Sequence, residues 1–156
     1  MGIKIIEIIV AGMIAGFIHK AVHEVGHLLC FKFFGLEFVR LRLGFIELFK
    51  ENETEKIRLK RTSIIEFSCT CKNLNLLSKP KIIITLLAGG FANFFLVIIC
   101  FLICFFVKVE LVKIFLYCQM SWSLFDFLAN VVNPYSVDRK HITTLDRVRR
   151  EKINDA

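Results

Sequence analysis

Hydrophobic residues along the chain form three long runs, which cover about residues 5–34, 82–107 and 111–132. A helix that crosses a bilayer needs ~20 consecutive and mostly apolar residues, so each run is long enough to span a membrane. The second run contains no charged residue, whereas the first and the third contain several. The pattern therefore predicts three transmembrane helices, two of which carry polar groups into the bilayer.

The polar segment between the first two runs, about residues 36–70, alternates with a period of two. Apolar and basic positions alternate over Val39–Leu43 and again over Ile57–Leu59, on either side of a polar turn near Asn52. Such alternation is typical of half-buried strands, so we expect a membrane-associated β-hairpin here. The strand at Val39–Leu43 would offer its edge to an extended peptide.

Composition narrows the class of protein. The chain has 156 residues, of which 56% are hydrophobic and 22% are charged, and it contains 17 Phe. Disordered chains are less hydrophobic, and soluble domains are typically about 45–50% apolar. We expect a mainly α, polytopic membrane protein with a three-helix transmembrane core, folded as a single domain over residues 1–156 with a basic tail at 139–156.

Charge predicts the orientation in the cell membrane. The net charge is +7, and ten Lys and Arg lie between the first two runs while six lie in the tail. Basic loops stay in the cytoplasm, so the N-terminus should lie outside and the C-terminus inside. In so apolar a chain the basic residues favour an anionic lipid bilayer rather than nucleic acid as partner. The oligomeric state is not predicted.

The first run contains a His-Glu-x-x-His pattern from His23 to His27. Residues four apart share one face of a helix, so His23 and His27 can bind the same metal ion, and Zn²⁺ accepts imidazole nitrogen readily. Glu24 is placed to act as general base for a zinc-bound water. Ionisable residues are costly inside a membrane unless they pair or bind something, which favours a metal site over a merely polar helix end.

A catalytic zinc site needs a third protein ligand. We favour Asp138, which follows the third run on the same side of the membrane as the end of the first. His19 is one rival because it lies four residues before His23. Asp126 is another, although we expect it about two helical turns deeper in the bilayer.

The second run contains small residues one turn before an amide, in Ala88-Gly89-Gly90-Phe91-Ala92-Asn93. Small residues let helices approach closely in lipid, and a buried amide needs partners. Asn93 could donate a hydrogen bond to a substrate carbonyl during hydrolysis, or it could hydrogen-bond another helix. The sequence does not decide between these two roles.

These three motifs, in this order, resemble those of the site-2 protease family of intramembrane zinc metalloproteases. His23, Glu24, Gly26 and His27 match the family's His-Glu-x-Gly-His. Ala88, Gly89 and Asn93 match its second motif, with Gly90 where proline is usual. Asn130 and Asp138 match its third motif, Asn-x-x-Pro-x-x-x-Leu-Asp-Gly, in which the chain departs at Asn133, Val137 and Arg139.

The resemblance implies a zinc-dependent endopeptidase that hydrolyses a peptide bond in or near the transmembrane segment of a membrane-protein or membrane-bound peptide substrate. His23, His27 and Asp138 would bind Zn²⁺, Glu24 would be the general base, and Asn93 would stabilise the oxyanion. Two alternatives stay open: a catalytically inactive scaffold that binds a partner's transmembrane helix, and an ion transporter that uses the histidines as a relay.

Overall fold

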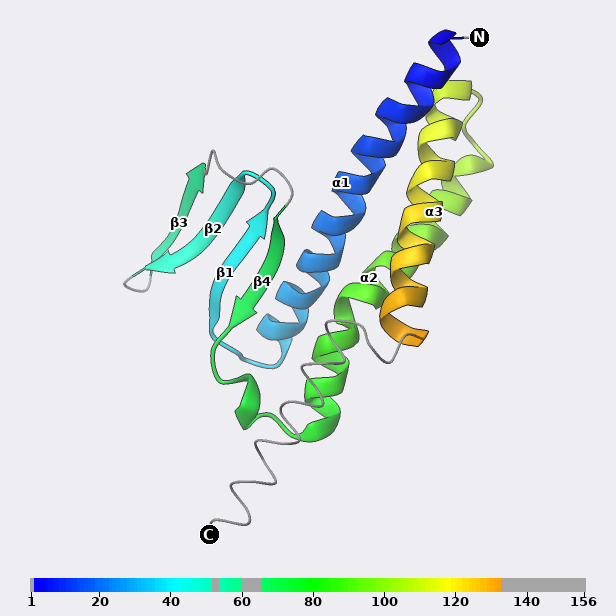
Figure 1. Ribbon diagram of the computed structural model, residues 1–156. Helices are drawn as coiled ribbons and strands as arrows, with labels where there is room; N and C mark the ends of the chain where they lie inside the picture. The colour runs from blue at the N-terminus through cyan, green and yellow to red at the C-terminus, as the bar shows by residue number, and fades with distance from the viewer. Residues whose placement is uncertain (1, 52–53, 60–65, 133–156) are drawn as a thin grey trace.

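The structure, a computed structural model, describes residues 2–51, 54–59 and 66–132. Within these residues it contains three long helices and a four-stranded antiparallel sheet, which confirms the mainly helical fold (Figure 1). The elements in chain order are α1 (Gly2–Phe33), β1 (Phe38–Leu43), β2 (Ile46–Glu51), β3 (Thr54–Leu59), β4 (Phe67–Cys71), a short 3₁₀ turn η1 (Leu74–Leu76), α2 (Lys79–Cys104) and α3 (Glu110–Val132).

The helix ends follow local sequence chemistry. α1 ends where Gly35 adopts φ +68°, while the backbone N–H of Leu36 donates to the carbonyl of Phe31 across the last turn. This is the glycine-terminated cap that satisfies carbonyls at a helix C-terminus. α2 begins with Pro80 in its first turn, where the missing N–H costs nothing.

Apolar side chains of the three helices mostly face outwards. Ile6 is 63% exposed, Phe95 is 62% exposed and Phe125 is 68% exposed, whereas several polar side chains are buried between the helices. A soluble protein has the opposite distribution, because buried polar groups must be paired and large apolar patches avoid water. The segments Lys4–Phe33, Lys79–Cys104 and Glu110–Asn130 are long and apolar enough to cross a membrane. Composition and burial thus agree with the three predicted spans.

The sheet differs from the predicted hairpin. Its strand order is β3-β2-β1-β4, and β1 pairs with β2 on one side and with β4 on the other. The expectation that Val39–Leu43 pairs with Ile57–Leu59 was wrong, since β2 lies between them. Gly44 explains the difference: its φ of +61° allows a tight turn directly after β1, so the chain reverses earlier than the polar residues near Asn52 suggest.

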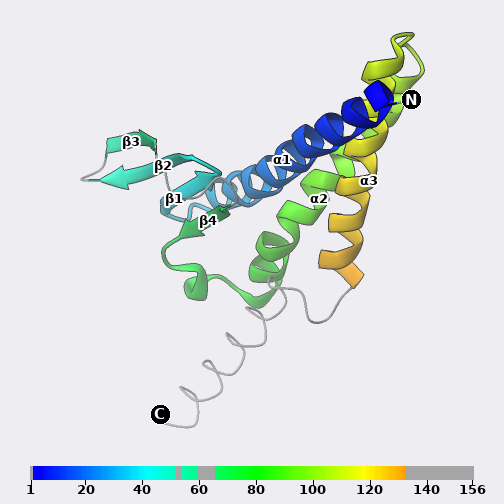
Figure 2. The ribbon, with the colours of Figure 1, turned by 45° about the horizontal axis from the view of Figure 1, so that its top comes forward.

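β1 is therefore an interior strand, and the expectation that it offers its edge to a peptide was also wrong. Among the described residues the strands at the two edges of the sheet are β3 and β4. Of these, β4 contacts α1, and the ring of Phe67 at its start lies 5.1 Å from the ring of Phe17. Figures 1 and 2 show the sheet on one side of α1, with α2 and α3 on the other.

The three helices pack closely through small residues. A Cβ atom on Gly26 of α1 would lie 2.7 Å from the carbonyl oxygen of Ala88 and 2.7 Å from the Cβ of Ala92, both in α2. No real side chain tolerates such distances, so the two backbones touch here because residue 26 is glycine. At the other end of the bundle an exposed ion pair joins Lys4 of α1 to Glu110 of α3.

Candidate metal centre

One face of α1 carries the candidate residues. Its buried positions recur every four residues and comprise Ala11, Ala15, His19, His23, His27 and Phe31. Each step of four residues turns the side chain by only about 40° around the helix, so the buried stripe winds slowly round α1 where it packs against α2 and α3. The histidines therefore lie inside the bundle rather than towards lipid.

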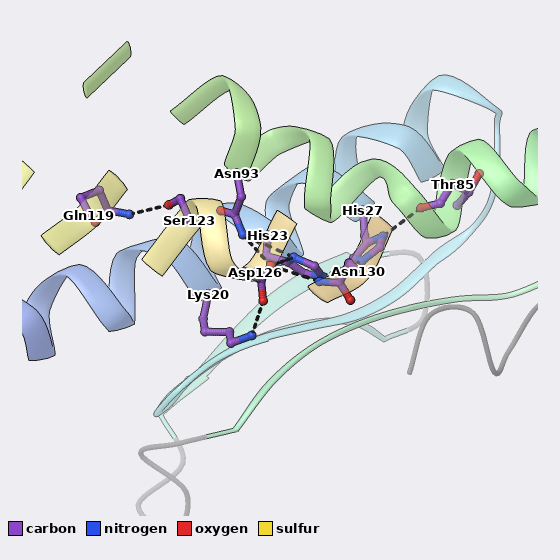
Figure 3. Close-up of polar contacts among 9 residues, drawn as sticks. All are labelled: Lys20, His23, His27, Thr85, Asn93, Gln119, Ser123, Asp126 and Asn130. Atoms are coloured by element: carbon purple, nitrogen blue, oxygen red, sulfur yellow. Dashed lines mark hydrogen bonds and ion pairs between the residues drawn. The ribbon is translucent and has the colours of Figure 1, made fainter. Parts of the chain in front are cut away.

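The two histidines of the motif point towards each other (Figure 3). The Nε2 atoms of His23 and His27 are 3.2 Å apart. His27 donates from Nδ1 to the carbonyl oxygen of Thr85 at 2.8 Å, and His23 donates from Nδ1 to the carboxylate of Asp126 at 2.7 Å. Because a carbonyl and a carboxylate can only accept, both Nδ1 atoms carry hydrogen, so in the neutral form of each ring Nε2 carries the lone pair.

Asp126 lies at the centre of a network that joins all three helices. Its Oδ2 accepts from Nδ1 of His23 at 2.7 Å, from Nδ2 of Asn93 at 2.8 Å and from Nδ2 of Asn130 at 3.2 Å. Its Oδ1 accepts from Nζ of Lys20 at 2.7 Å. The side chain of Asp126 is only 8% exposed, so these donors replace the water that an exposed carboxylate would bind.

Asn93 is fully buried, and its amide group is oriented by Asp126. Its Nδ2 also lies 3.5 Å from Nδ1 of His23, but that approach sets two donors against each other, so we assign the hydrogen bond to the carboxylate. The Oδ1 of Asn93 has no hydrogen-bond partner among the described residues. The amide thus lies beside the imidazole pair, with one of its hydrogens engaged.

Glu24 lies one position round α1 from His23 and is half-buried. With His27 it lines a cavity of about 420 Å³ between α1, β4 and α2, whose wall also includes Ser68, Cys69 and Leu86. Burial and the nearby Glu24 carboxylate raise the pKa of the Cys69 thiol to about 12. Cys69 is therefore a neutral thiol at physiological pH, and it lines the cavity beside the Glu24 side chain.

Gly89 of α2 makes room for the His23 ring. A Cβ at this position would lie 2.5 Å from Nε2 of His23 and 2.7 Å from its Cε1. Any larger residue would have to displace the imidazole, since α2 is packed against α1 at this level. The small residues of the second motif thus shape the site as well as the helix contact.

The three candidates for a third ligand occupy different places. Asp126 reaches His23, although we expected it about two helical turns deeper in the bilayer, but it contacts Nδ1 and not the Nε2 atoms that converge. His19 stacks on Trp122, with ring centroids 5.5 Å apart and planes inclined by 8°. Asp138 lies outside the described residues. Within the described part of the chain, no group of three His, Cys, Asp or Glu side chains is arranged to hold a metal ion.

The arrangement of His23 and His27 nevertheless fits a metal ion. The two Nε2 atoms lie 3.2 Å apart, which is close enough for both to bind one cation through their lone pairs when the rings are neutral. Both rings are held through Nδ1 by an oxygen acceptor, as is usual for histidines that bind metal. Imidazole nitrogen is a ligand that Zn²⁺ and other divalent transition metals accept, so the pair fits such an ion.

Lys20, Thr85 and Asn130 complete the network, although motif analysis assigned no such contact to them. A signal for part of it is present in α3, where the polar residues Gln119, Ser123, Asp126 and Asn130 recur at intervals of four, three and four. That spacing puts them on one face of a helix whose other faces are apolar. Thr85 carries no comparable signal, because its backbone carbonyl is the group that binds His27.

The apolar exterior, together with the paired imidazoles beside Glu24, defines a class: a membrane protein with the His-Glu-x-x-His helix of metallopeptidases. The sequence profile of Peptidase family M50 matches residues 11–148. The chain belongs to this family, the site-2 protease family, whose members are zinc metalloproteases, so the predicted relationship is confirmed. No curated protein and no solved structure matches the chain significantly. Family membership and three apolar helices together indicate an integral membrane protein.

Proposed function

We propose that the chain is a zinc-dependent intramembrane endopeptidase that hydrolyses a peptide bond in or near a substrate's transmembrane segment. The observation that carries the proposal is the approach of the His23 and His27 Nε2 atoms to 3.2 Å, next to Glu24 at a cavity wall. Membership of Peptidase family M50 supports the same chemistry.

His23, His27 and Asp138 are the residues that we propose to hold Zn²⁺. The geometry of their rings supports the assignment of the two histidines. The match to the family's third motif supports the assignment of Asp138. When bound, the metal supplies a Lewis acid that makes water acidic enough to attack a peptide bond at neutral pH.

Glu24 is the proposed general base. It would take a proton from the attacking water and pass it to the leaving amine. Its position one step from His23 on the same helix, at the wall of the cavity, supports that role. The raised pKa of Cys69 also supports it, because a neutral thiol beside Glu24 neither competes for the proton nor adds negative charge.

Asn93 is the proposed donor to the substrate's carbonyl oxygen. One hydrogen of its amide serves Asp126, and the other is available to an oxyanion as the substrate reaches the site. The contact with Asp126 holds the amide in a fixed orientation, so little reorganisation is needed during the reaction.

The edge of β4 is the proposed docking place for the unwound substrate. The N–H of Gly44 donates to the carbonyl of Glu66, so residue 66 faces β1. Alternate residues of an antiparallel strand face the same way, which directs the backbone of Cys69 away from β1. Cys69 also lines the cavity with Glu24, so a peptide paired there would lie next to the proposed base.

We propose that the site opens towards the cytoplasm and that the N-terminus lies outside the cell. The distribution of basic residues supports this orientation, with ten between the first two spans and six in the tail. The lipid bilayer and a membrane-embedded or membrane-bound polypeptide are the expected partners.

Replacing Glu24 by Gln tests the proposed chemistry. Glu24→Gln keeps the shape of the side chain but removes the base, so we expect cleavage of a single-span test substrate to fall by ~10²–10⁴-fold. Zinc content of the purified chain should not change. The matched control is Glu7→Gln on the same helix, which should leave both unchanged.

Loss of zinc without loss of cleavage would contradict the assignment, as would full activity of Glu24→Gln. The departures from the third motif at Asn133, Val137 and Arg139 favour a second candidate, an inactive scaffold that binds a partner's helix. A wild-type chain that binds such a helix but never cleaves it would support this second function.

A further inference from the structure

Asp126 is a buried carboxylate that the family motifs do not explain. It is buried, lies in the second half of α3 and accepts from four side chains on three helices. Such a group is expensive inside a membrane, because it loses water and gains only what its partners supply. A role that requires its charge at this place would account for it.

The two carboxylate oxygens of Asp126 accept hydrogen bonds from different partners. Oδ1 contacts Nζ of Lys20, whereas Oδ2 contacts the ring of His23 together with two amides. A carboxylate oxygen has about two acceptor positions, so Oδ2 is already saturated. Asp126 therefore has no position left on that oxygen with which to bind a metal ion.

We propose that Asp126 is a positioning residue for the metal centre and not one of its ligands. It holds His23 in the tautomer with hydrogen on Nδ1, so that Nε2 presents its lone pair towards His27. Asn93 and Asn130 hold the carboxylate in place. The inference rests on the proposed zinc site. Asp126 belongs to none of the three family motifs, so its role at the site is additional to theirs.

The competing explanation is that Asp126 only neutralises Lys20. Lys20 contacts Oδ1 of Asp126 from a partly exposed position, whereas His23 contacts Oδ2 from a buried one. The amides of Asn93 and Asn130 donate to that same Oδ2, so they hold the oxygen that accepts from His23 and not the one that accepts from Lys20. The arrangement of donors thus favours the histidine as the reason for the carboxylate.

Zinc affinity separates the two explanations. The full chain is purified in lipid nanodiscs, and its zinc affinity is measured by competition with a chromogenic chelator. Asp126→Asn preserves volume but can donate to Nδ1 as readily as accept, so we expect affinity to fall roughly 10- to 100-fold. Lys20→Met should change affinity much less.

The double variant Lys20→Met/Asp126→Asn decides the matter, because it removes both charges of the ion pair. If Asp126 positions His23, the double variant stays as weak as Asp126→Asn. If Asp126 only neutralises Lys20, the double variant recovers wild-type affinity, and that result would overturn the inference.

A second measurement needs no variant of Asp126 to fold. The ¹⁵N shifts of the histidine ring nitrogens in the zinc-free wild-type chain report the tautomer, and His23→Gln identifies the His23 signals. Hydrogen on Nδ1 of His23 supports the inference, and hydrogen on Nε2 alone overturns it. A wild-type chain that binds no zinc would defeat the proposed function, while this tautomer would still decide the role of Asp126.

Discussion

Single side chains determine whether the two imidazoles can meet. Gly89 leaves the space that the His23 ring occupies, and Thr85 and Asp126 orient the two rings from behind. None of these three residues has to touch a metal ion to matter. Substituting them should weaken metal binding through the geometry of the histidines.

Gly89→Ala tests whether the space at residue 89 is needed for metal binding, because it adds a single methyl group. Its Cβ would lie 2.5 Å from Nε2 of His23, so the ring must move, and we expect zinc affinity to fall at least about tenfold, as for other supporting residues of metal sites. Chelator competition on the purified chain measures the change.

Gly12→Ala is the matched control, because nothing lies within 4 Å of a Cβ on this residue of α1. It should leave zinc affinity unchanged and raise the free energy of unfolding by up to ~1 kcal/mol, since alanine favours a helix over glycine. Equal zinc affinity in the two variants would contradict the role given to Gly89.

The sequence predicted that His23 and His27 lie together, but it did not predict which residues orient their rings. His23 and His27 lie four apart on one helix, so their common face follows from helical geometry alone. The contact of Asp126 with His23 depends on how far α3 slides along α1, and no local pattern encodes that register. This is why the sequence kept Asp126 only as a rival ligand and did not predict its contact with Nδ1 of His23.

At the scale of elements, the sheet contributes an edge to the candidate site. β4 ends the sheet on the side of α1, and its residues Ser68 and Cys69 line the same cavity as Glu24. An extended substrate that pairs with this edge would gain main-chain hydrogen bonds in exchange for those lost when its own helix unwinds.

Cys69→Pro probes that pairing, because proline removes the N–H that points away from β1 without removing a bond to β1. A hydrogen bond is worth about 0.5–1.5 kcal/mol net, so KM for a test substrate should rise by roughly 2- to 10-fold. kcat and zinc affinity should stay near wild-type values in steady-state and chelator assays.

Cys69→Val is the control for that experiment, since valine keeps the backbone N–H and an apolar side chain. It should behave like the wild type. If the proline and valine variants show the same KM, the substrate does not use this edge.

The helices could be predicted from the sequence far better than the strand pairing. Runs of more than 20 apolar residues leave few alternatives in a membrane, and the chain has three of them. The sheet contains short strands with similar alternation, and a turn at Gly44 decides which of them pair. The left-handed backbone of that glycine, which the sequence permits but does not require, places β2 between the two alternating segments.

For the whole molecule, the orientation in the membrane is the main prediction. The apolar exterior indicates a bundle that crosses a bilayer, while the positions of Lys and Arg predict which end faces the cytoplasm. A green fluorescent protein fused after Ala156 should fluoresce, and alkaline phosphatase fused there should be inactive in bacterial cells.

Fusions after Lys108, between α2 and α3, are the internal control and should give the opposite result. Active phosphatase at both positions, or at Ala156 alone, would contradict the proposed orientation. The site would then face the outside, and substrates would have to approach from that surface.

The close contact at Gly26 limits the routes by which a polypeptide can approach the metal centre. The backbones of α1 and α2 touch there, because the Gly26 Cα lies against the carbonyl of Ala88 and the methyl group of Ala92. At this level the two helices leave no room for a third one between them. The cavity that Glu24 lines lies between α1, β4 and α2, so we expect a substrate to reach Glu24 along the edge of the sheet.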